Sequence, residues 1–251
     1  KNKKNKINSK EFTKYFQSGK KFFKDQDIII GSENKITFEI DKNKKIKNLS
    51  VKSNLNFDNV KIDYISNRIK KRIPNYKNHI FLNSDYLKLD YTDNKIQIKA
   101  KGRYSFNDKF DDYEINIINE KDKYDFESYI SLNNNSIFIE EIDYSKNKDS
   151  SSIIKLKANY IKNKDIKIEH ALYSEDKNYI GISNLKLSKD YKVKDIDELE
   201  LNYLNKNKNL NNLKILKSKN KYILKGEQFD GESLVKNILN GNSNNSFLKI
   251  F

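Results

Sequence analysis

Apolar and polar residues alternate along most of this chain, and the alternation limits its possible folds more than any other feature. Leu, Ile, Val, Tyr or a small residue stands at every second position, with polar residues, mostly Lys, Asn, Asp or Glu, between. The pattern is clear over 49–55, 96–100 and 154–160. Because successive side chains of a β-strand point to opposite faces, these segments predict strands with one apolar and one polar face.

The alternating segments recur roughly every 10–14 residues, which leaves no room for crossover helices and favours antiparallel hairpins. Short polar clusters separate them, such as Asp41-Lys42-Asn43, Asp93-Asn94 and Lys219-Asn220. Asn and Asp favour turns because their side chains bond to nearby backbone. The sequence therefore predicts a mainly β fold, a long antiparallel meander of about fifteen strands.

Three segments have helical spacing instead, and we expect helices near 9–24, 65–73 and 231–240. Ser9 and Asp230 are suitable N-caps for the first and third, and Pro74 ends the second. We divide the chain into three parts by these patterns. They are an amphipathic helical segment over 1–30, one continuous β domain over 31–240 that ends in a capping helix, and a loop or domain edge over 241–251.

No catalytic, cofactor or metal site is indicated. There is no cysteine, and His79 and His170 have no partners at metal-ligand spacing. His170 also falls at an apolar position of its strand. The acidic pairs Asp111-Asp112 and Glu140-Glu141 are expected to be solvated in turns, and no glycine-rich phosphate loop occurs. We expect a protein that is not an enzyme.

The chain carries 50 Lys and Arg against 35 Asp and Glu, yet only Arg68, Arg72 and Arg103 are arginine. A nucleic-acid-binding protein would use arginine more often for bidentate contacts with bases and phosphates. Lys, Asn and Ile are common together, and their AT-rich codons explain this composition without an anionic partner. Nucleic-acid binding is therefore not expected, although a basic nucleic-acid-binding module stays an alternative.

The sequence contains no methionine, and it has no apolar run long enough for a membrane helix. We therefore expect it to be an internal piece of a longer protein. Any anchor or export signal would lie outside this piece.

One segment resembles a known family. The strand Lys221–Gly226 leads into Glu227-Gln228-Phe229-Asp230 and then into the predicted helix through Leu239. A strand ending in Gly, then x-x-Phe-Asp and a short helix, is similar to a signature of AsmA-like proteins of the YhdP type, which belong with TamB among bridge-like lipid-transfer proteins. The stretch 142–147 and the sequence Arg72-Ile73-Pro74 also look like this family. The likeness covers about residues 45–240.

The resemblance implies a periplasmic segment of a protein that is anchored in the inner membrane elsewhere in its chain. Such proteins are thought to move phospholipid towards the outer membrane along a long bent sheet, an open apolar groove shaped like a folded taco. The partners would be phospholipid acyl chains and no cofactor is needed. The expected groove residues are Ile154, Leu156, Ile166, Ile168, Ile180, Ile182, Leu199 and Leu201. The expected motif residues are Gly226, Phe229, Asp230, Leu234 and Ile238.

Alternation alone leaves another fold open. The same apolar face could pack on itself as a dry β-sandwich or closed barrel with a structural or interaction role, because both arrangements need one apolar face. A repetitive surface protein would require near-identical repeats, and we find none. Bound lipid would distinguish the groove from the dry core.

Overall fold

The computed structural model describes residues 4–9, 26–147 and 149–232, which are mainly β-strand. The strands, in chain order, are β1 (Asn5–Asn8), β2 (Asp27–Ile40), β3 (Ile46–Asp63), β4 (His79–Thr92), β5 (Lys95–Ser105), β6 (Asp111–Glu120), β7 (Lys123–Ser131), β8 (Ile137–Ile139), β9 (Tyr144–Lys146), β10 (Ser152–Ile161), β11 (Ile166–Glu175), β12 (Asn178–Leu187), β13 (Val193–Asp195), β14 (Glu198–Leu204), β15 (Leu210–Ser218) and β16 (Lys221–Gln228). The helical elements are α2 (Asn67–Arg72) and the 3₁₀ turn η2 (Glu140–Ile142).

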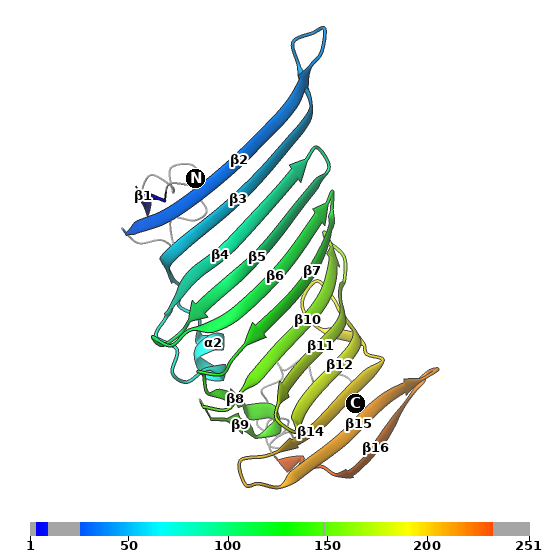
Figure 1. Cartoon of the computed structure of the whole chain (residues 1–251). Helices are drawn as coiled ribbons and strands as arrows, with labels where there is room; N and C mark the ends of the chain where they lie inside the picture. The colour runs from blue at the N-terminus through cyan, green and yellow to red at the C-terminus, as the bar shows by residue number, and fades with distance from the viewer. Residues whose placement is uncertain (1–3, 10–25, 148, 233–251) are drawn as a thin grey trace. The chain divides into compact units, whose positions relative to one another are not determined.

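One antiparallel sheet contains all of these strands except β8 and β9, which form a separate two-stranded hairpin (Figure 1). Within the described residues the large sheet does not close into a barrel. The predicted fold class is confirmed: the chain is mainly β, a long antiparallel meander with few short helices, as expected for an open groove. The predicted turns at Asp41, Asp93 and Lys219 lie between strands.

The chain packs as two compact units, a division that the alternation does not reveal. Unit 1 contains residues up to 70 and 75–124, and unit 2 contains 71–74 and the residues from 125 onward. In unit 1 the strands are neighbours in the order β1-β2-β3-β4-β5-β6. In unit 2 the order is β10-β11-β12-β14-β15-β16, with β13 beside β12.

The strand register of unit 1 separates apolar from polar side chains. One continuous row across β3, β4, β5 and β6 consists of Leu55, Leu87, Ala100 and Ile115. The adjacent row on the opposite face consists of Asn54, Lys88, Lys99 and Asn116. The predicted two-sided sheet is thus present at the level of individual cross-strand pairs, the contacts that stabilise a sheet.

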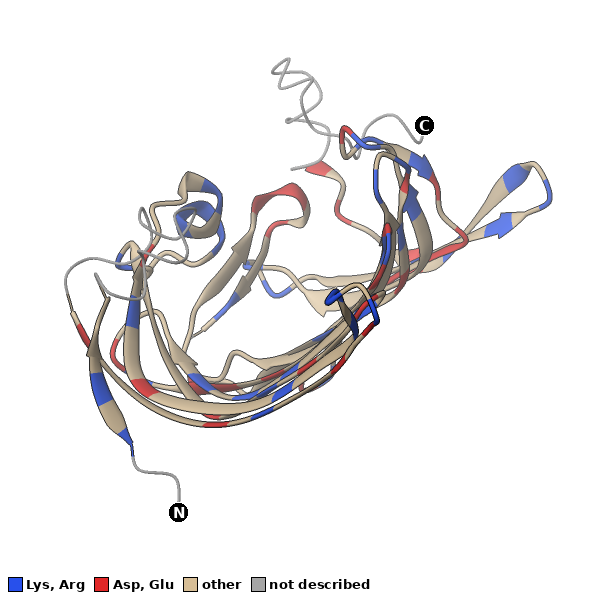
Figure 2. Ribbon diagram, turned by 90° about the horizontal axis from the view of Figure 1, so that it is seen from above, with Lys and Arg blue, Asp and Glu red and all other residues tan. Residues whose placement is uncertain are grey.

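The strands also bend along their length, as Figure 2 shows. In unit 2 the hairpin β8–β9, recognisable by its red turn, lies on the concave side of this bend. Positive φ angles at Asn59 and Asn184 accompany irregularities in the pairing. Such bulges increase local bending and twist.

One bulge in unit 2 corrects the predicted position of His170. Ile168 pairs with Ala158 and the next pair along β11 is His170 with Lys157, so Glu169 is left out of the register. After Glu169 the odd-numbered residues Ala171 and Tyr173 take the apolar face that Ile166 and Ile168 occupy before it. His170 is therefore exposed on the polar face. The simple period-two pattern over 166–172 was wrong there because it did not allow for the extra residue.

The helix predictions have mixed outcomes. The predicted segment 65–73 contains α2, which ends two residues before Pro74. Most of the segments 9–24 and 231–240 lies outside the described residues. Ser9 exchanges two hydrogen bonds with Gln26, from Ser9 N to the Gln26 carbonyl at 2.8 Å and from Gln26 N to Ser9 Oγ at 3.0 Å.

Gly226 does not end its strand, contrary to the prediction, because β16 continues to Gln228. It lies where the pairing of β15 with β16 shifts between Asn212 and Lys214. A Cβ at residue 226 would lie 2.3 Å from the Asn212 carbonyl oxygen, closer than any real contact. Glycine is therefore required here by the close approach of two backbones.

We predict that Gly226→Ala lowers the free energy of unfolding by about 1–3 kcal/mol, since backbone must move to admit the methyl group. Gly181→Ala in the same unit is the matched control. Its Cβ would lie 3.9 Å from the nearest atom, and the change should be neutral or stabilise by up to about 1 kcal/mol. Urea unfolding followed by circular dichroism measures both. Equal stability of the two variants would contradict the close approach.

Candidate functional site

All eight predicted groove residues of unit 2 lie on one face of the sheet. The register forms one row from Ile154 through Tyr173, Ile180, Leu201 and Leu213. A parallel row consists of Leu156, Ala171, Ile182, Leu199, Ile215 and Leu224. Two shorter rows contain Ile168 with Ala158 and Leu185, and Ile166 with Tyr160 and Leu187. We call the side chains of these four rows the apolar face of unit 2.

This face is not sealed like the interior of a compact domain. Leu199 and Leu201 are buried, with 7% and 5% of their surface exposed. The other six predicted residues are only half-buried. Among the described residues of unit 2, no second large sheet covers these side chains. A continuous strip of aliphatic surface is therefore left partly open.

One end of the apolar face is covered by the hairpin β8–β9. Tyr144 of this hairpin is almost fully buried and its ring meets Tyr173 and Tyr203 edge-on, at centroid distances of 5.5 and 5.6 Å. Tyr173 belongs to the first row of the apolar face, and Tyr203 continues the alternation of Leu199 and Leu201. The hairpin thus packs directly onto the apolar face.

A buried polar network accompanies this contact. The Tyr144 hydroxyl lies 2.8 Å from the Tyr173 hydroxyl and donates to the Glu175 carboxylate. Ser150 donates to the other carboxylate oxygen of Glu175. Burial, assisted by the hydrogen bonds to Glu175 and Tyr173, raises the pKa of Tyr144 well above its ordinary value. These hydroxyls therefore stay protonated and serve as hydrogen-bond donors.

Lys146, at the end of β9, is also buried, with 1% of its surface exposed. Its ammonium donates to the carbonyls of Asn135 and Asn147, each at 2.8 Å. A buried charge is tolerated only when its hydrogen bonds are satisfied. These bonds tie the two ends of the hairpin segment together.

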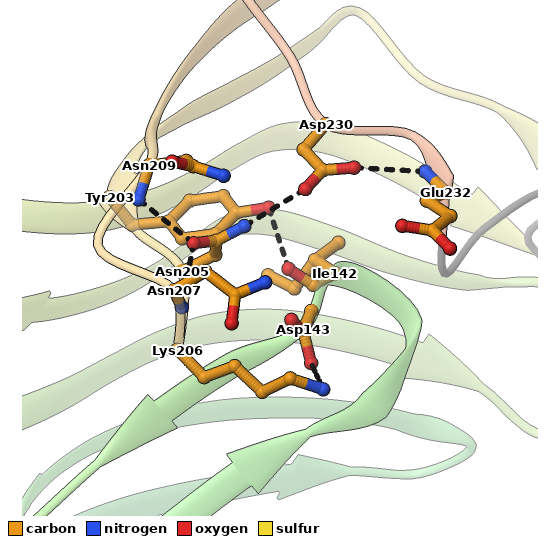
Figure 3. Close-up of polar contacts among 9 residues, drawn as sticks. All are labelled: Ile142, Asp143, Tyr203, Asn205, Lys206, Asn207, Asn209, Asp230 and Glu232. Atoms are coloured by element: carbon orange, nitrogen blue, oxygen red, sulfur yellow. Dashed lines mark hydrogen bonds and ion pairs between the residues drawn. The ribbon is translucent and has the colours of Figure 1, made fainter.

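The turn of the hairpin is joined to the loop between β14 and β15 (Figure 3). The Tyr203 hydroxyl donates to the Ile142 carbonyl at 2.8 Å, and Lys206 bonds Asp143 through both backbone and side chain. Asn205, which orders this loop through Asn207 N and Asn209 N, donates from its amide to Asp230 at 3.0 Å. Segments far apart in the sequence therefore meet at one end of the apolar face.

Asp230 makes the contact expected of an N-cap. Its Oδ1 accepts from Glu232 N at 3.1 Å, and its own N–H donates to Asn211 Oδ1 at 2.6 Å. Phe229 is half-buried. Leu234 and Ile238, the other predicted motif residues, lie outside the described residues.

The expectation that both acidic pairs are solvated was wrong. Asp111 is buried at the start of β6. Glu141 accepts two hydrogen bonds from the Arg72 guanidinium, at 2.5 and 2.6 Å, and Lys71 pairs with Glu140. Burial alone would raise the pKa of Glu141, but the Arg72 hydrogen bonds and the nearby positive charges outweigh it and lower the pKa below 4.5. This fork-shaped pair secures η2 to the end of α2.

Neither histidine is part of a metal cluster. His79 packs edge-on against Phe81, with ring centroids 4.9 Å apart. Across the described ranges, no group of three or more His, Asp or Glu side chains could hold a metal ion. The helices within those ranges include none that is long and apolar enough to cross a membrane.

The sequence did not identify the tyrosine cluster or the Arg72–Glu141 pair. Tyr203 could have been noticed as the aromatic end of an otherwise aliphatic alternation. Tyr173 was concealed by the bulge at Glu169, and nothing in the local sequence distinguishes Tyr144 or Lys146 from exposed residues.

Comparisons of this chain with protein-family models, with curated proteins and with solved structures found no match.

We predict that Asp230→Ala lowers the free energy of unfolding by about 0.5–2 kcal/mol, because it removes the acceptor for Glu232 N and for the Asn205 amide. Asp230→Asn is the matched control, since asparagine is an equally good N-cap. Urea unfolding of the three proteins makes the comparison. Equal losses in both variants would show that the carboxylate charge matters rather than the cap.

We predict that Glu141→Gln destabilises the protein by about 1 kcal/mol at pH 7. Because the pKa of Glu141 is lowered in the folded state, its contribution is present above about pH 4.5 and is lost as the pH falls through the folded pKa. The difference from wild type should therefore shrink in acid. Glu227→Gln, at an exposed site in the same unit, should have little effect at any pH. Thermal unfolding from pH 3 to 7 tests this, and a constant difference would refute it.

Proposed function

We propose that this chain is a non-catalytic segment of an envelope protein of the AsmA/YhdP type. It shelters phospholipid acyl chains on its apolar face during transport between the inner and outer membranes. The observation that carries the proposal is the set of continuous Ile and Leu rows on one face of an open sheet, most of whose predicted residues are only half-buried. The proposal places the segment in the periplasm, with a membrane anchor outside this chain.

The rows suit a sliding apolar ligand. Moving an acyl chain out of water gains about 0.8 kcal/mol for each methylene that is buried. Side chains such as Ile154, Ile182 and Leu213 offer this contact on β10, β12 and β15 and present no polar group that would fix a lipid at one point. Uniform contacts of this kind hold the chain while leaving it free to move along the rows.

The dimensions are also suitable. Neighbouring strands lie about 4.8 Å apart, so the six strands from β10 to β16 along the sheet path span about 24 Å. One leaflet of a bilayer has an apolar depth of about 15 Å. An extended acyl chain could therefore be accommodated by unit 2 alone.

The opposite face of unit 2 suits exposure to water. One of its rows contains Lys155, Glu200, Lys214 and Lys225 beside Leu172 and Gly181. Lys214 pairs with Glu198 at 2.5 Å. The sheet thus has one face for apolar cargo and one for solvent, and transport of this kind needs no catalytic residue.

Photo-crosslinking tests this sidedness with adjacent residues. A photoreactive amino acid at Ile168 should capture phospholipid, because Ile168 lies between Ala158 and Leu185 on the apolar face. The same group at Lys167 should not, because Lys167 lies between Asn159 and Lys186 on the other face. Ile98 and Lys99 supply an equivalent pair in unit 1. Mass spectrometry of the adducts is the readout.

Equal capture at Ile168 and Lys167 would contradict sidedness. Protein crosslinks at Ile168 with no lipid adduct would favour the alternative in which this face packs against another protein surface as a dry core.

A further inference from the structure

The hairpin formed by β2 and β3 extends beyond the rest of unit 1. β2 and β3 stay paired as far as Ile40 and Ile46, whereas the pairing of β3 with β4 begins only at Ser50 and Thr92. The tip therefore projects past β4, as Figure 1 shows. We call residues 35–47, which include this projecting end and the residues leading into it, the hairpin tip.

The tip exposes large apolar side chains on one face. Ile36, Phe38 and Ile40 alternate along β2, and Ile46 lies opposite Ile40. The extra residue of the local bulge is in β3, at Asn48 with φ 54°, so the alternation of β2 is not interrupted. The exposed fractions are 60% for Ile36, 50% for Phe38, 64% for Ile40 and 61% for Ile46. This clustering on one projecting face is unusual for a surface in contact with water alone.

Lysines are frequent in the tip, and Lys42, Lys44 and Lys45 lie at the turn that ends the apolar cluster. The tip contains Lys35, Lys42, Lys44, Lys45 and Lys47 against Glu39 and Asp41, so its net charge is 5 − 2 = +3. All five lysines are exposed. An exposed apolar cluster that ends in a basic turn is a combination suited to the interface of an anionic bilayer.

Asp41 gives the tip a defined turn. Its Oδ1 accepts from Asn43 N at 2.8 Å and Lys45 N at 2.9 Å, and Lys44 N donates to the Asp41 carbonyl. The backbone bond from Lys45 N lowers the pKa of Asp41, with support from Lys47 and Asn43 against a smaller opposing effect of desolvation. The turn therefore holds Lys42, Lys44 and Lys45 at the end of a preformed hairpin, so little ordering is needed on binding.

We propose that the hairpin tip docks onto a membrane surface with anionic headgroups, inserting Phe38, Ile40 and Ile46 at the level of the headgroups while its lysines contact the lipid phosphates. The tip is a binding surface separate from the apolar face of unit 2, and the proposal does not depend on whether that face carries lipid.

Vesicle sedimentation of the full 251-residue chain tests the proposal. The vesicles contain phosphatidylcholine and phosphatidylglycerol at 3:1, or phosphatidylcholine alone. Wild type should bind the anionic vesicles at least about tenfold more tightly than the neutral ones. Phe38→Ser with Ile40→Ser should weaken binding by about tenfold or more, because two large apolar contacts are lost. Lys42→Gln, Lys44→Gln and Lys45→Gln together should remove most of the preference for anionic lipid.

The hairpin between β15 and β16 supplies matched controls. Ile223→Ser changes an apolar side chain that is 42% exposed and lies opposite Leu216, on the face away from the apolar face of unit 2. Lys219→Gln with Lys221→Gln changes two lysines at its turn. Both control variants should bind vesicles like wild type, and circular dichroism checks that every variant is folded.

Several results would overturn the proposal. Binding to neutral vesicles as tight as to anionic ones would show that anionic headgroups do not contribute to binding. An equal loss of vesicle binding in the tip and control variants would show that binding does not depend on the tip. Absence of vesicle binding, with self-association that the Phe38 and Ile40 substitutions abolish, would assign the tip to contact with a second copy of the chain. By contrast, loss of vesicle binding in the Phe38 and Ile40 variant with unchanged lipid capture at Ile168 would support the proposal and separate this surface from the proposed groove.

Discussion

The cross-strand rows of aliphatic side chains are the feature on which the rest of this structure depends. A row such as Leu156, Ala171, Ile182, Leu199 and Ile215 stabilises each strand against the next and also creates a strip of apolar surface. In a sandwich a second sheet would cover that strip. Within the described residues no second large sheet covers it, the hairpin β8–β9 packs onto one end, and most of the predicted residues are only half-buried. The energetic need to cover this surface is the physical reason to expect an apolar ligand.

Polar side chains define where the apolar strip ends. Tyr144 of the hairpin packs against Tyr203 of the sheet. The Tyr144 hydroxyl donates to Glu175, and the Tyr203 hydroxyl donates to the Ile142 carbonyl. The Arg72–Glu141 pair ties η2, at the turn of the same hairpin, to the end of α2. Unsatisfied groups at this depth would be costly, so the network favours a single position of the hairpin. Unit 2 therefore combines a uniform apolar surface with a specific closure at one end.

Much of this architecture could be predicted from the sequence because alternation reports directly on strand faces. It predicted the antiparallel meander, and the eight groove positions prove to share one face. It failed where geometry depends on an extra residue or on distant partners. The extra residue at Glu169 places His170 on the polar face. The close approach of the Asn212 backbone requires a glycine at residue 226, although β16 does not end there. The tyrosine cluster joins segments about 30–60 residues apart, and no local pattern encodes such contacts. The lipid role and the AsmA-like resemblance remain proposals.

Native mass spectrometry of the chain, purified from bacterial envelopes without added lipid, tests the central claim most directly. If the apolar face shelters acyl chains, the spectrum should contain protein with bound phospholipid, and Ile168→Lys with Ile182→Lys should remove those peaks while the protein stays folded. A spectrum of lipid-free protein only, from preparations in which the apolar face is accessible, would contradict the account.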